Sequence, residues 1–345
     1  RQMKERMVAL GVMPAERIQV VGVPRFDFYH RPLTTIAPTR SEVCRTYDLD
    51  PARPIALWAT NFCGASSYAR SPAFFLADCK RLGIDRIIDP ERFARADVAA
   101  RDRSADLIAD SLRALPDLQL LVKPHPGEDV DYFRAFVARC PPGRAALVQN
   151  AYIWQVFPAC DVLIKRSCTT GVEAWMLGLP TIELQVDPER HYYSAEHAAG
   201  SAFADDAPSL LAHVVDALAK KPYNADILAS RKRFIDTWCH RNDGESTKRF
   251  VHVLDDLARE RATAGRAVDR VMPCPDTILH QVRQRSLVAA DYFLHDRKLF
   301  GWRGRQDHQG RIDKWFRERD GRTWRNLLRP IAQEVSSKSA LGAVA

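Results

Sequence analysis

Short, largely apolar runs alternate with segments of helical spacing through the first 260 residues, and this alternation constrains the fold more than any other feature. The run at 118–122 (LQLLV) is apolar on both faces, as strands of buried parallel sheets are. The segment before it, 103–115, places Ile108, Leu112 and Leu115 on one helical face. Strands and helices in this rhythm form right-handed βαβ units, so the sequence predicts an α/β, Rossmann-like doubly wound parallel sheet.

The pattern places strands at 18–22, 55–59, 118–122, 146–149, 162–164 and 180–184, and helices at 3–10, 103–115, 129–139, 153–157, 171–178, 208–220, 225–239 and 245–260. Residues 63–100 lack clear periodicity and are expected to form a long excursion. The chain opens at Arg1 inside a helical pattern that stops at Gly11, a typical helix end. We therefore expect a fragment whose upstream part is missing.

The net positive charge of the chain arises in its C-terminal region. The 345-residue chain is 46% hydrophobic, as globular proteins are, and long enough for about two domains. Residues 261–345 hold 17 of the 51 Lys and Arg and 9 of the 43 Asp and Glu, and so carry the whole net charge of +8. We predict three regions: a linker and entry segment (1–45), a Rossmann-like sheet domain (46–260) and a basic, mostly helical extension (261–345).

Residues 123–128 (KPHPGE) follow the strand at 118–122. Ligands of an open parallel sheet bind outside the carboxyl ends of its strands. Pro124 and Pro126 restrict the backbone around His125 and hold its imidazole in a fixed direction. We interpret His125 and Lys123 as ligand-facing residues; the alternative is an exposed proline-rich turn.

A second candidate segment joins the strand at 162–164 to the following helix. The start of a helix attracts anions, and here it coincides with cations and hydroxyls. The expected phosphate ligands are Arg166, Ser167, Thr169, Thr170 and Gly171. The alternative is N-capping, which needs only one hydroxyl. Glu173, one turn further on, is expected to bind ribose hydroxyls; the alternative is that it complements the helix dipole.

Asn61 lies in a polar turn (TNFCG) after the strand at 55–59 and is a weaker candidate for donor binding. The motifs GxGxxG, Walker A, HExxH and GxSxG are absent from the sequence. Its His, Cys and carboxylate residues do not occur at metal-ligand spacing, and the eight Cys are scattered, as in a protein with reduced thiols. We expect no metal and no cofactor, which disfavours hydride transfer and zinc hydrolysis.

Three segments, 20–27 (VVGVPRFD), 123–128 (KPHPGE) and 167–180 (SCTTGVEAWMLGLP), together resemble the surface carbohydrate biosynthesis proteins. That family is related to GT-B glycosyltransferases and, more distantly, to UDP-N-acetylglucosamine 2-epimerases. Residues 60–62 (TNF) and 243–246 (DGES) also resemble family segments, and the likeness extends over about 18–258. It implies the donor-binding half of a GT-B protein, with the acceptor-binding half and the catalytic base upstream of it.

The resemblance also implies roles for single residues. His125, as the catalytic residue, and Lys123 would neutralise charge on the leaving phosphate, and Ser167, Thr169 and Thr170 would donate hydrogen bonds to it. Glu173 would contact the ribose or the base. Val23 stands where the family often has Asn, so the contribution of that turn is in doubt.

The function implied is a metal-independent glycosyltransferase that uses a CMP- or UDP-linked sugar in bacterial surface polysaccharide biosynthesis, such as lipopolysaccharide or capsule. The partners are a nucleotide-sugar donor and a glycan or glycolipid acceptor, with no nucleic acid. The location is the cytoplasm, at the inner face of the membrane if the tail binds lipid. Two alternatives are an enzyme that epimerises sugar nucleotides and a non-catalytic scaffold that binds them.

The basic extension carries an aromatic stripe at helical spacing, formed by Ile312, Trp315, Phe316, Trp324, Leu327 and Leu328. Cations surround the stripe, a pattern typical of a helix at a membrane surface. The alternative is a closing helix that packs its aromatic residues against the sheet domain or the missing half. A nucleic-acid contact is disfavoured, since no known nucleic-acid-binding module is present.

Overall fold

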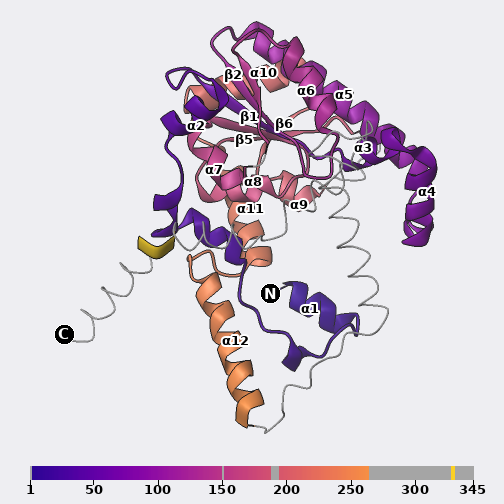
Figure 1. The fold of residues 1–345 in the computed structure, drawn as a ribbon, viewed down its shortest axis with the longest axis vertical. Coiled ribbons are helices and arrows are strands. Elements are labelled where there is room, and N and C mark those ends of the chain that lie inside the picture. The colour runs from indigo at the N-terminus through magenta and orange to yellow at the C-terminus, as the bar shows by residue number, and fades with distance from the viewer. Residues whose placement is uncertain (1, 150, 188–193, 264–327, 331–345) are drawn as a thin grey trace, which may run out of the picture. The chain divides into compact units, whose positions relative to one another are not determined.

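A computed structural model describes residues 2–149, 151–187, 194–263 and 328–330 of the protein. The chain divides into two compact units, Arg1–Ser246 and Thr247–Ala345. The first unit contains a six-stranded parallel sheet flanked by helices (Figure 1). In the second unit, the described residues are those of helix α12 (Ser246–Thr263) from Thr247 onward and the short segment 328–330.

The strand order is β3-β2-β1-β4-β5-β6, and every neighbouring pair is parallel. The strands are β1 (Ile55–Ala59), β2 (Gln119–Lys123), β3 (Ala145–Leu147), β4 (Val162–Lys165), β5 (Thr181–Leu184) and β6 (Ala202–Ala204). The chain moves outward from β1 to β3 and then returns to the other side of β1 at β4. This order is that of a doubly wound Rossmann-like sheet, so the predicted fold class is confirmed, and the switch point between β1 and β4 is where such folds bind ligands.

The helices form a layer on each face of the sheet (Figure 1). One layer contains α3 (Cys63–Arg70), α5 (Pro90–Ala114), α6 (Val130–Arg139) and α10 (Ala207–Leu218), and covers the main hydrophobic core. There Trp58 of β1 meets Phe133 and Phe136 of α6 edge to face, with ring centroids 5.6 and 5.4 Å apart. The other layer contains α2 (Arg40–Tyr47), α7 (Ile153–Val156), α8 (Thr170–Met176), α9 (Ala195–Ala198) and α11 (Ala225–Phe234).

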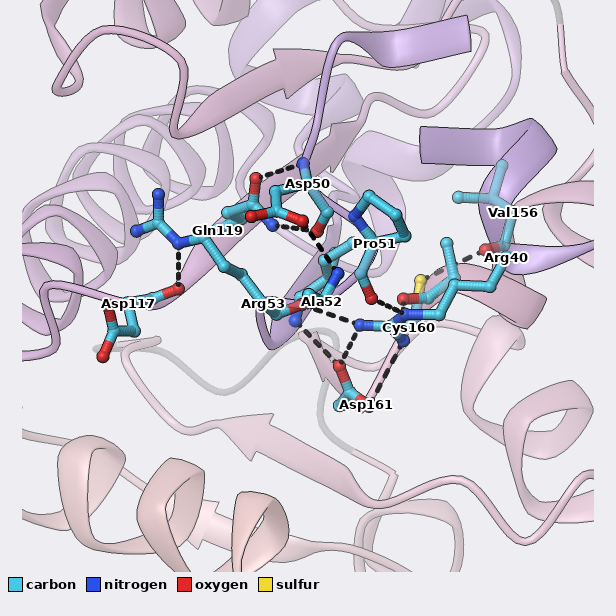
Figure 2. Close-up of polar contacts among 12 residues, drawn as sticks. Arg40, Asp50, Pro51, Ala52, Arg53, Asp117, Gln119, Val156, Cys160 and Asp161 are labelled. Atoms are coloured by element: carbon cyan, nitrogen blue, oxygen red, sulfur yellow. Dashed lines mark hydrogen bonds and ion pairs between the residues drawn. The ribbon is translucent and has the colours of Figure 1, made fainter. Parts of the chain in front are cut away.

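The amino edge of the sheet is held by one arginine and one aspartate (Figure 2). Arg40 donates to the carbonyls of Pro51, Arg53 and Ala159 at 2.7–2.8 Å and forms an ion pair with Asp161 at 3.0 Å. Asp161 also accepts the Ile55 backbone N–H at 2.8 Å. These bonds join α2 to the starts of β1 and β4. A cavity of about 660 Å³ lies at this edge, and Arg40 and Asp161 are among its lining residues.

Most of the expected elements are present. The remaining described helices of the first unit are α1 (Gln2–Ala9), α4 (Pro72–Arg81), the 3-10 segments Ala15–Arg17, Pro24–Tyr29, Leu33–Ile36, Ile84–Arg86 and Phe157–Ala159, and the π turn Ile235–Cys239.

The predicted strand at 18–22 is wrong, because this segment pairs with no strand. The long excursion at 63–100 is also wrong, because α3, α4 and the first half of α5 fill it. Asp89 caps α5 and Pro90 opens it, two start signals that the apolar periodicity does not register.

Within the described part of the chain, no helix is both long and apolar enough to span a membrane. The aromatic stripe of the basic extension lies outside the described residues, apart from Leu328.

Candidate functional site

The carboxyl edge of the sheet carries a row of polar side chains on one face. The strand register places Lys123 of β2 and Lys165 of β4 on either side of Ala59 of β1, with Glu183 of β5 next to Lys165. Residues paired across parallel strands point to the same face. Because Ala59 is small, the space between the two lysines is occupied by no large side chain from β1.

The two lysines have different electrostatic surroundings. Lys165 is fully buried and forms an ion pair with Glu183, which also accepts the Ser167 backbone N–H. Lys123 is half-buried and makes no hydrogen bond or ion pair within the described residues. Burial lowers the pKa of Lys123, and the interaction with Cys168 acts in the opposite direction. Lys123 is therefore a partly desolvated cation at the end of β2, one strand from the switch point, and no anion is paired with it among the described residues.

Glu128 fixes the turn that follows β2. Its buried carboxylate accepts hydrogen bonds from the Thr60 hydroxyl, the Phe62 N–H at 2.6 Å and the His125 N–H. Burial raises the pKa of Glu128 to about 7 against the lowering effect of these donors. The turn after β2 is thereby tied to the turn after β1. No role was predicted for Glu128, although this residue is the last of the KPHPGE motif.

His125 is exposed and lies against α3. Its Nδ1 atom is 3.1 Å from the Cys63 Sγ atom and accepts the Gly127 backbone N–H at 3.1 Å. Cys63 is the first residue of α3, directly after the β1 turn. The pairing of Cys63 with His125 was not predicted, because nothing in their spacing of 62 residues indicates contact.

The loop between β4 and α8 holds the other predicted ligands. Arg166 is buried, forms ion pairs with Asp97 at 2.7 Å and with Asp187, and donates to the Asn61 carbonyl at 2.9 Å. Lys165 and Arg166 thus both have carboxylate counter-ions inside the protein, and the phosphate contact of Arg166 stays a prediction. Gly171 is required by Lys165, since a Cβ atom there would lie 2.3 Å from the Lys165 Cε atom.

The hydroxyls of this loop are not used as helix caps. Thr169 occupies the N-cap position of α8 and makes no side-chain capping bond. The Thr170 hydroxyl is buried beside the Cys168 thiol and has no other hydrogen-bond partner among the described residues. Ser167 has φ +39°, a strained conformation for a residue other than glycine. Strain and an unsatisfied buried hydroxyl are features that functional loops commonly retain.

Glu173 has protein partners on both carboxylate oxygens. The Tyr29 hydroxyl donates to one oxygen, and Arg25 forms an ion pair with the other at 3.4 Å. Burial raises the pKa of Glu173. The segment Pro24–Tyr29 is thereby attached to α8, so two of the motifs that carry the family resemblance are in contact. The ribose contact of Glu173 stays a prediction, and in this structure the carboxylate serves that attachment.

The structure thus brings the turns after β1, β2 and β4 together at one edge. The contacts are Thr60 and Phe62 with Glu128, and Asn61 with Arg166; Lys123 and Cys168 interact electrostatically. Of the Asn61 groups, the backbone carbonyl is the one in contact. Among the described residues, no group of three or more His, Cys, Asp or Glu is arranged to hold a metal ion.

No protein-family model and no curated protein matches the chain. Similar solved structures include the wall teichoic acid polymerase TagF, with 13% identity, a TM-score of 0.48 and 76% of this chain covered. They also include a putative UDP-N-acetylglucosamine 2-epimerase from Listeria monocytogenes (14%, TM-score 0.41, 75%) and the Neisseria meningitidis UDP-GlcNAc 2-epimerase bound to UDP-GlcNAc (11%, 0.41, 73%). The chain covers 57%, 58% and 59% of these structures, respectively. A likeness this weak assigns no function.

Proposed function

We propose that the carboxyl edge of β1, β2 and β4 binds the phosphate portion of a nucleotide-activated sugar. The observation that carries the proposal is Lys123, a half-buried ammonium at the end of β2, next to β1, with no anion paired with it in the described structure. Leaving a cation partly desolvated and unpaired is unfavourable, and a bound phosphate would remove that cost. The buried Thr170 hydroxyl at the start of α8, beside the Cys168 thiol, supplies a second donor that has no other hydrogen-bond partner among the described residues.

The reaction proposed is glycosyl transfer, as the sequence resemblance implies. The bond between the anomeric carbon and the phosphate oxygen breaks, and its electron pair stays on that oxygen. The acceptor oxygen bonds to the anomeric carbon and gives up its proton to a base. Lys123 and His125 would stabilise the charge that develops on the leaving phosphate, an electrostatic role that acts mainly in the transition state.

Epimerisation is less well supported by this edge. It needs acid and base carboxylates that can reach the sugar. The buried carboxylates of this edge, Glu128, Glu173 and Glu183, each have partners inside the protein. The surface polysaccharide pathway, the CMP- or UDP-linked donor, the glycan or glycolipid acceptor and the cytoplasmic location stay predictions.

Titration calorimetry of the full chain with CMP, CDP and UDP tests the proposal. We expect at least one nucleotide to bind, and Lys123→Met to weaken binding about 10- to 100-fold, the range for losing a hydrogen bond to a charged group. Lys80→Met, which removes an exposed lysine from α4, is the matched control and should bind as the wild type does. Equal affinities for Lys123→Met and the control would place the nucleotide elsewhere. No binding by any nucleotide would refute the donor site.

A further inference from the structure

The two ring nitrogens of His125 are chemically distinct in this site. The Gly127 backbone N–H points at Nδ1 at 3.1 Å, with the nitrogen as the acceptor. A ring nitrogen accepts a hydrogen bond only when it carries a lone pair rather than a proton. A proton on Nδ1 would instead face the Gly127 N–H, donor against donor. The backbone geometry of the KPHPGE turn therefore favours the tautomer with its proton on Nε2.

The thiol of Cys63 acts on the same nitrogen. Its Sγ atom lies 3.1 Å from Nδ1, within range for a hydrogen bond involving sulfur. As a neutral thiol, Cys63 donates to the Nδ1 lone pair and adds to the preference set by Gly127. The three groups are closely packed: a Cβ atom on Gly127 would lie 3.3 Å from Sγ and 3.4 Å from Nδ1.

The backbone of His125 is held independently of its ring. The Glu128 carboxylate accepts the His125 N–H, and Pro124 and Pro126 restrict the residues on either side. With the backbone fixed, the contacts at Nδ1 determine how the ring is oriented and which nitrogen carries the proton. A second group that fixes the tautomer of a functional histidine is a recurring device in enzyme sites.

We propose that Cys63 is a positioning residue which, with Gly127, holds His125 as the neutral tautomer protonated on Nε2. Given the proposed donor site, His125 then meets the leaving phosphate as a hydrogen-bond donor through Nε2–H. In this tautomer Nε2 has no lone pair and cannot act as a general base. The assignment separates the role of His125 from that of the base that accepts the acceptor's proton.

Nitrogen NMR of the full chain labelled with ¹⁵N-histidine tests the proposal without any ligand. The His125 signals are identified by their loss in His125→Gln. We expect wild-type His125 to show a protonated Nε2 and an unprotonated Nδ1 at pH 7.5. In Cys63→Ala the ratio of the two tautomers should shift about three- to fivefold towards Nδ1–H, the factor set by a hydrogen bond of about 1 kcal/mol or slightly less. Cys63→Ser keeps a donor and should restore the wild-type ratio.

Cys140→Ala is the matched control, because Cys140 is also half-buried but lies at the end of α6 and bonds to the Phe136 carbonyl. It should leave the His125 signals unchanged. A wild-type His125 protonated on Nδ1 or on both nitrogens would overturn the proposal. An unaltered ratio in Cys63→Ala would overturn the role of Cys63.

Nucleotide affinity gives the second readout. If Nε2–H contacts phosphate, nucleotide affinity scales with the fraction of His125 in the Nε2–H tautomer. Cys63→Ala should therefore weaken nucleotide binding in proportion to the fall in that fraction measured by NMR, and Cys63→Ser should restore it. If the chain binds no nucleotide, the proposed function fails while the NMR result still decides the tautomer. Nucleotide binding that is equally tight in Cys63→Ala, despite a measured fall in the Nε2–H fraction, would show that Nε2–H does not contact the phosphate.

Discussion

Among the cations of the carboxyl edge, the presence or absence of a carboxylate partner decides which residue can receive a ligand. Glu183 neutralises Lys165, and Asp97 and Asp187 neutralise Arg166. A buried charge that already has a partner gains little from a second one, whereas an unpaired charge gains much. Lys123 is the lysine of this edge that lacks such a partner in the described structure, so an incoming anion is expected to bind there.

The buried ion pair of Lys165 and Glu183 stabilises the carboxyl edge of the sheet. Replacing Glu183 with Gln leaves the fully buried Lys165 ammonium without a counter-ion. We expect Glu183→Gln to lower the free energy of unfolding by about 3–5 kcal/mol, measured by urea denaturation. Asp110→Asn removes the partner of Arg113 in an exposed ion pair on α5 and should cost less than about 1 kcal/mol. Similar costs for the two variants would contradict the assigned importance of the buried pair.

Glu128 makes stability depend on pH. Burial raises its pKa from the ordinary 4.5 to about 7, so the folded protein keeps a proton that the unfolded chain releases above pH 4.5. Its contribution to the free energy of unfolding therefore falls as pH rises from about 4.5 to 7, by up to about 3 kcal/mol. His197 acts in the opposite sense, because burial and the nearby Lys165 lower its pKa to about 3. A wild-type profile alone would mix the two effects.

The difference between wild type and Glu128→Gln isolates the carboxyl group. Urea denaturation at several pH values should show the stability advantage of the wild type shrinking by about 3 kcal/mol between pH 4.5 and 7. An advantage that stays constant or grows over this range would mean that the folded pKa of Glu128 is not raised.

At the scale of elements, the alternating pattern located β1 to β5. The signal is clearest for β1, β2 and β4, because buried parallel strands are marked by runs of apolar residues. The pattern failed where tertiary contacts, rather than the local sequence, decide which secondary structure forms. Residues 18–22 have a strand-like composition, but a strand exists only if an edge of the sheet is available to pair with it. β6 has three residues and is too short to show a pattern. In α5, the buried positions include Ala94, Asp97 and Arg101, which hide the apolar periodicity.

The candidate site was predicted to a similar extent. The topology rule brought the strand-end motifs to one edge, since parallel strands end together. It could not show that Arg166 is neutralised by Asp97, 69 residues away, or that Tyr29 reaches Glu173 across 144 residues. These pairings depend on tertiary packing. Local signals did exist for Cys63 and Glu128, which end the turns after β1 and β2.

Asp161 provides the test of how the elements at the amino edge are joined (Figure 2). Asp161→Ala removes the ion pair with Arg40 and leaves the Ile55 N–H at the start of β1 without its acceptor. We expect a loss of about 2–4 kcal/mol in the free energy of unfolding. Asp117→Ala, at an exposed residue of the same edge, should cost less than about 0.5 kcal/mol. Asp161 lies at the amino edge of the sheet, so Asp161→Ala should leave nucleotide affinity at the carboxyl edge unchanged. A loss of nucleotide affinity without a loss of stability would contradict the assignment of Asp161 to a purely structural role.

At the scale of the whole molecule, the unit Arg1–Ser246 is assembled from segments far apart in the chain. Asp27 is buried and accepts the Ser246 N–H at 3.1 Å, while Arg25 pairs with Glu173. The His30 Nε2 atom lies 2.8 Å from the Asn242 Oδ1 atom. A Cβ atom on Gly244 would lie 2.7 Å from the His30 Cβ atom. The segment around Pro24–Tyr29 therefore connects residues 167–180 and 243–246, two segments that also contribute to the sequence resemblance.

The distribution of charge over the whole chain leads to the last prediction. Residues 261–345 carry the entire net charge of +8, whereas the first 260 residues are balanced. A cationic segment next to an anionic bilayer gains about 1 kcal/mol per Lys or Arg near the surface. We expect the full chain to co-sediment with vesicles that contain phosphatidylserine and not with neutral vesicles, and binding to fall steeply as salt is raised.

Two charge variants decide whether the tail is responsible. Changing Arg311, Lys314, Arg317, Arg322, Arg325 and Arg329 to Gln lowers the tail charge from +8 to +2 and should abolish co-sedimentation. The control changes six exposed cations of the first unit to Gln: Arg45, Lys80, Arg86, Arg134, Lys220 and Arg241. If both variants bind equally, the attraction is not specific to the tail. If the wild type fails to bind at low salt, a tail packed against the protein, the alternative reading of its aromatic stripe, is favoured. Trp fluorescence distinguishes electrostatic adsorption from insertion, since only insertion of Trp315 and Trp324 among lipid chains shifts their emission to shorter wavelength.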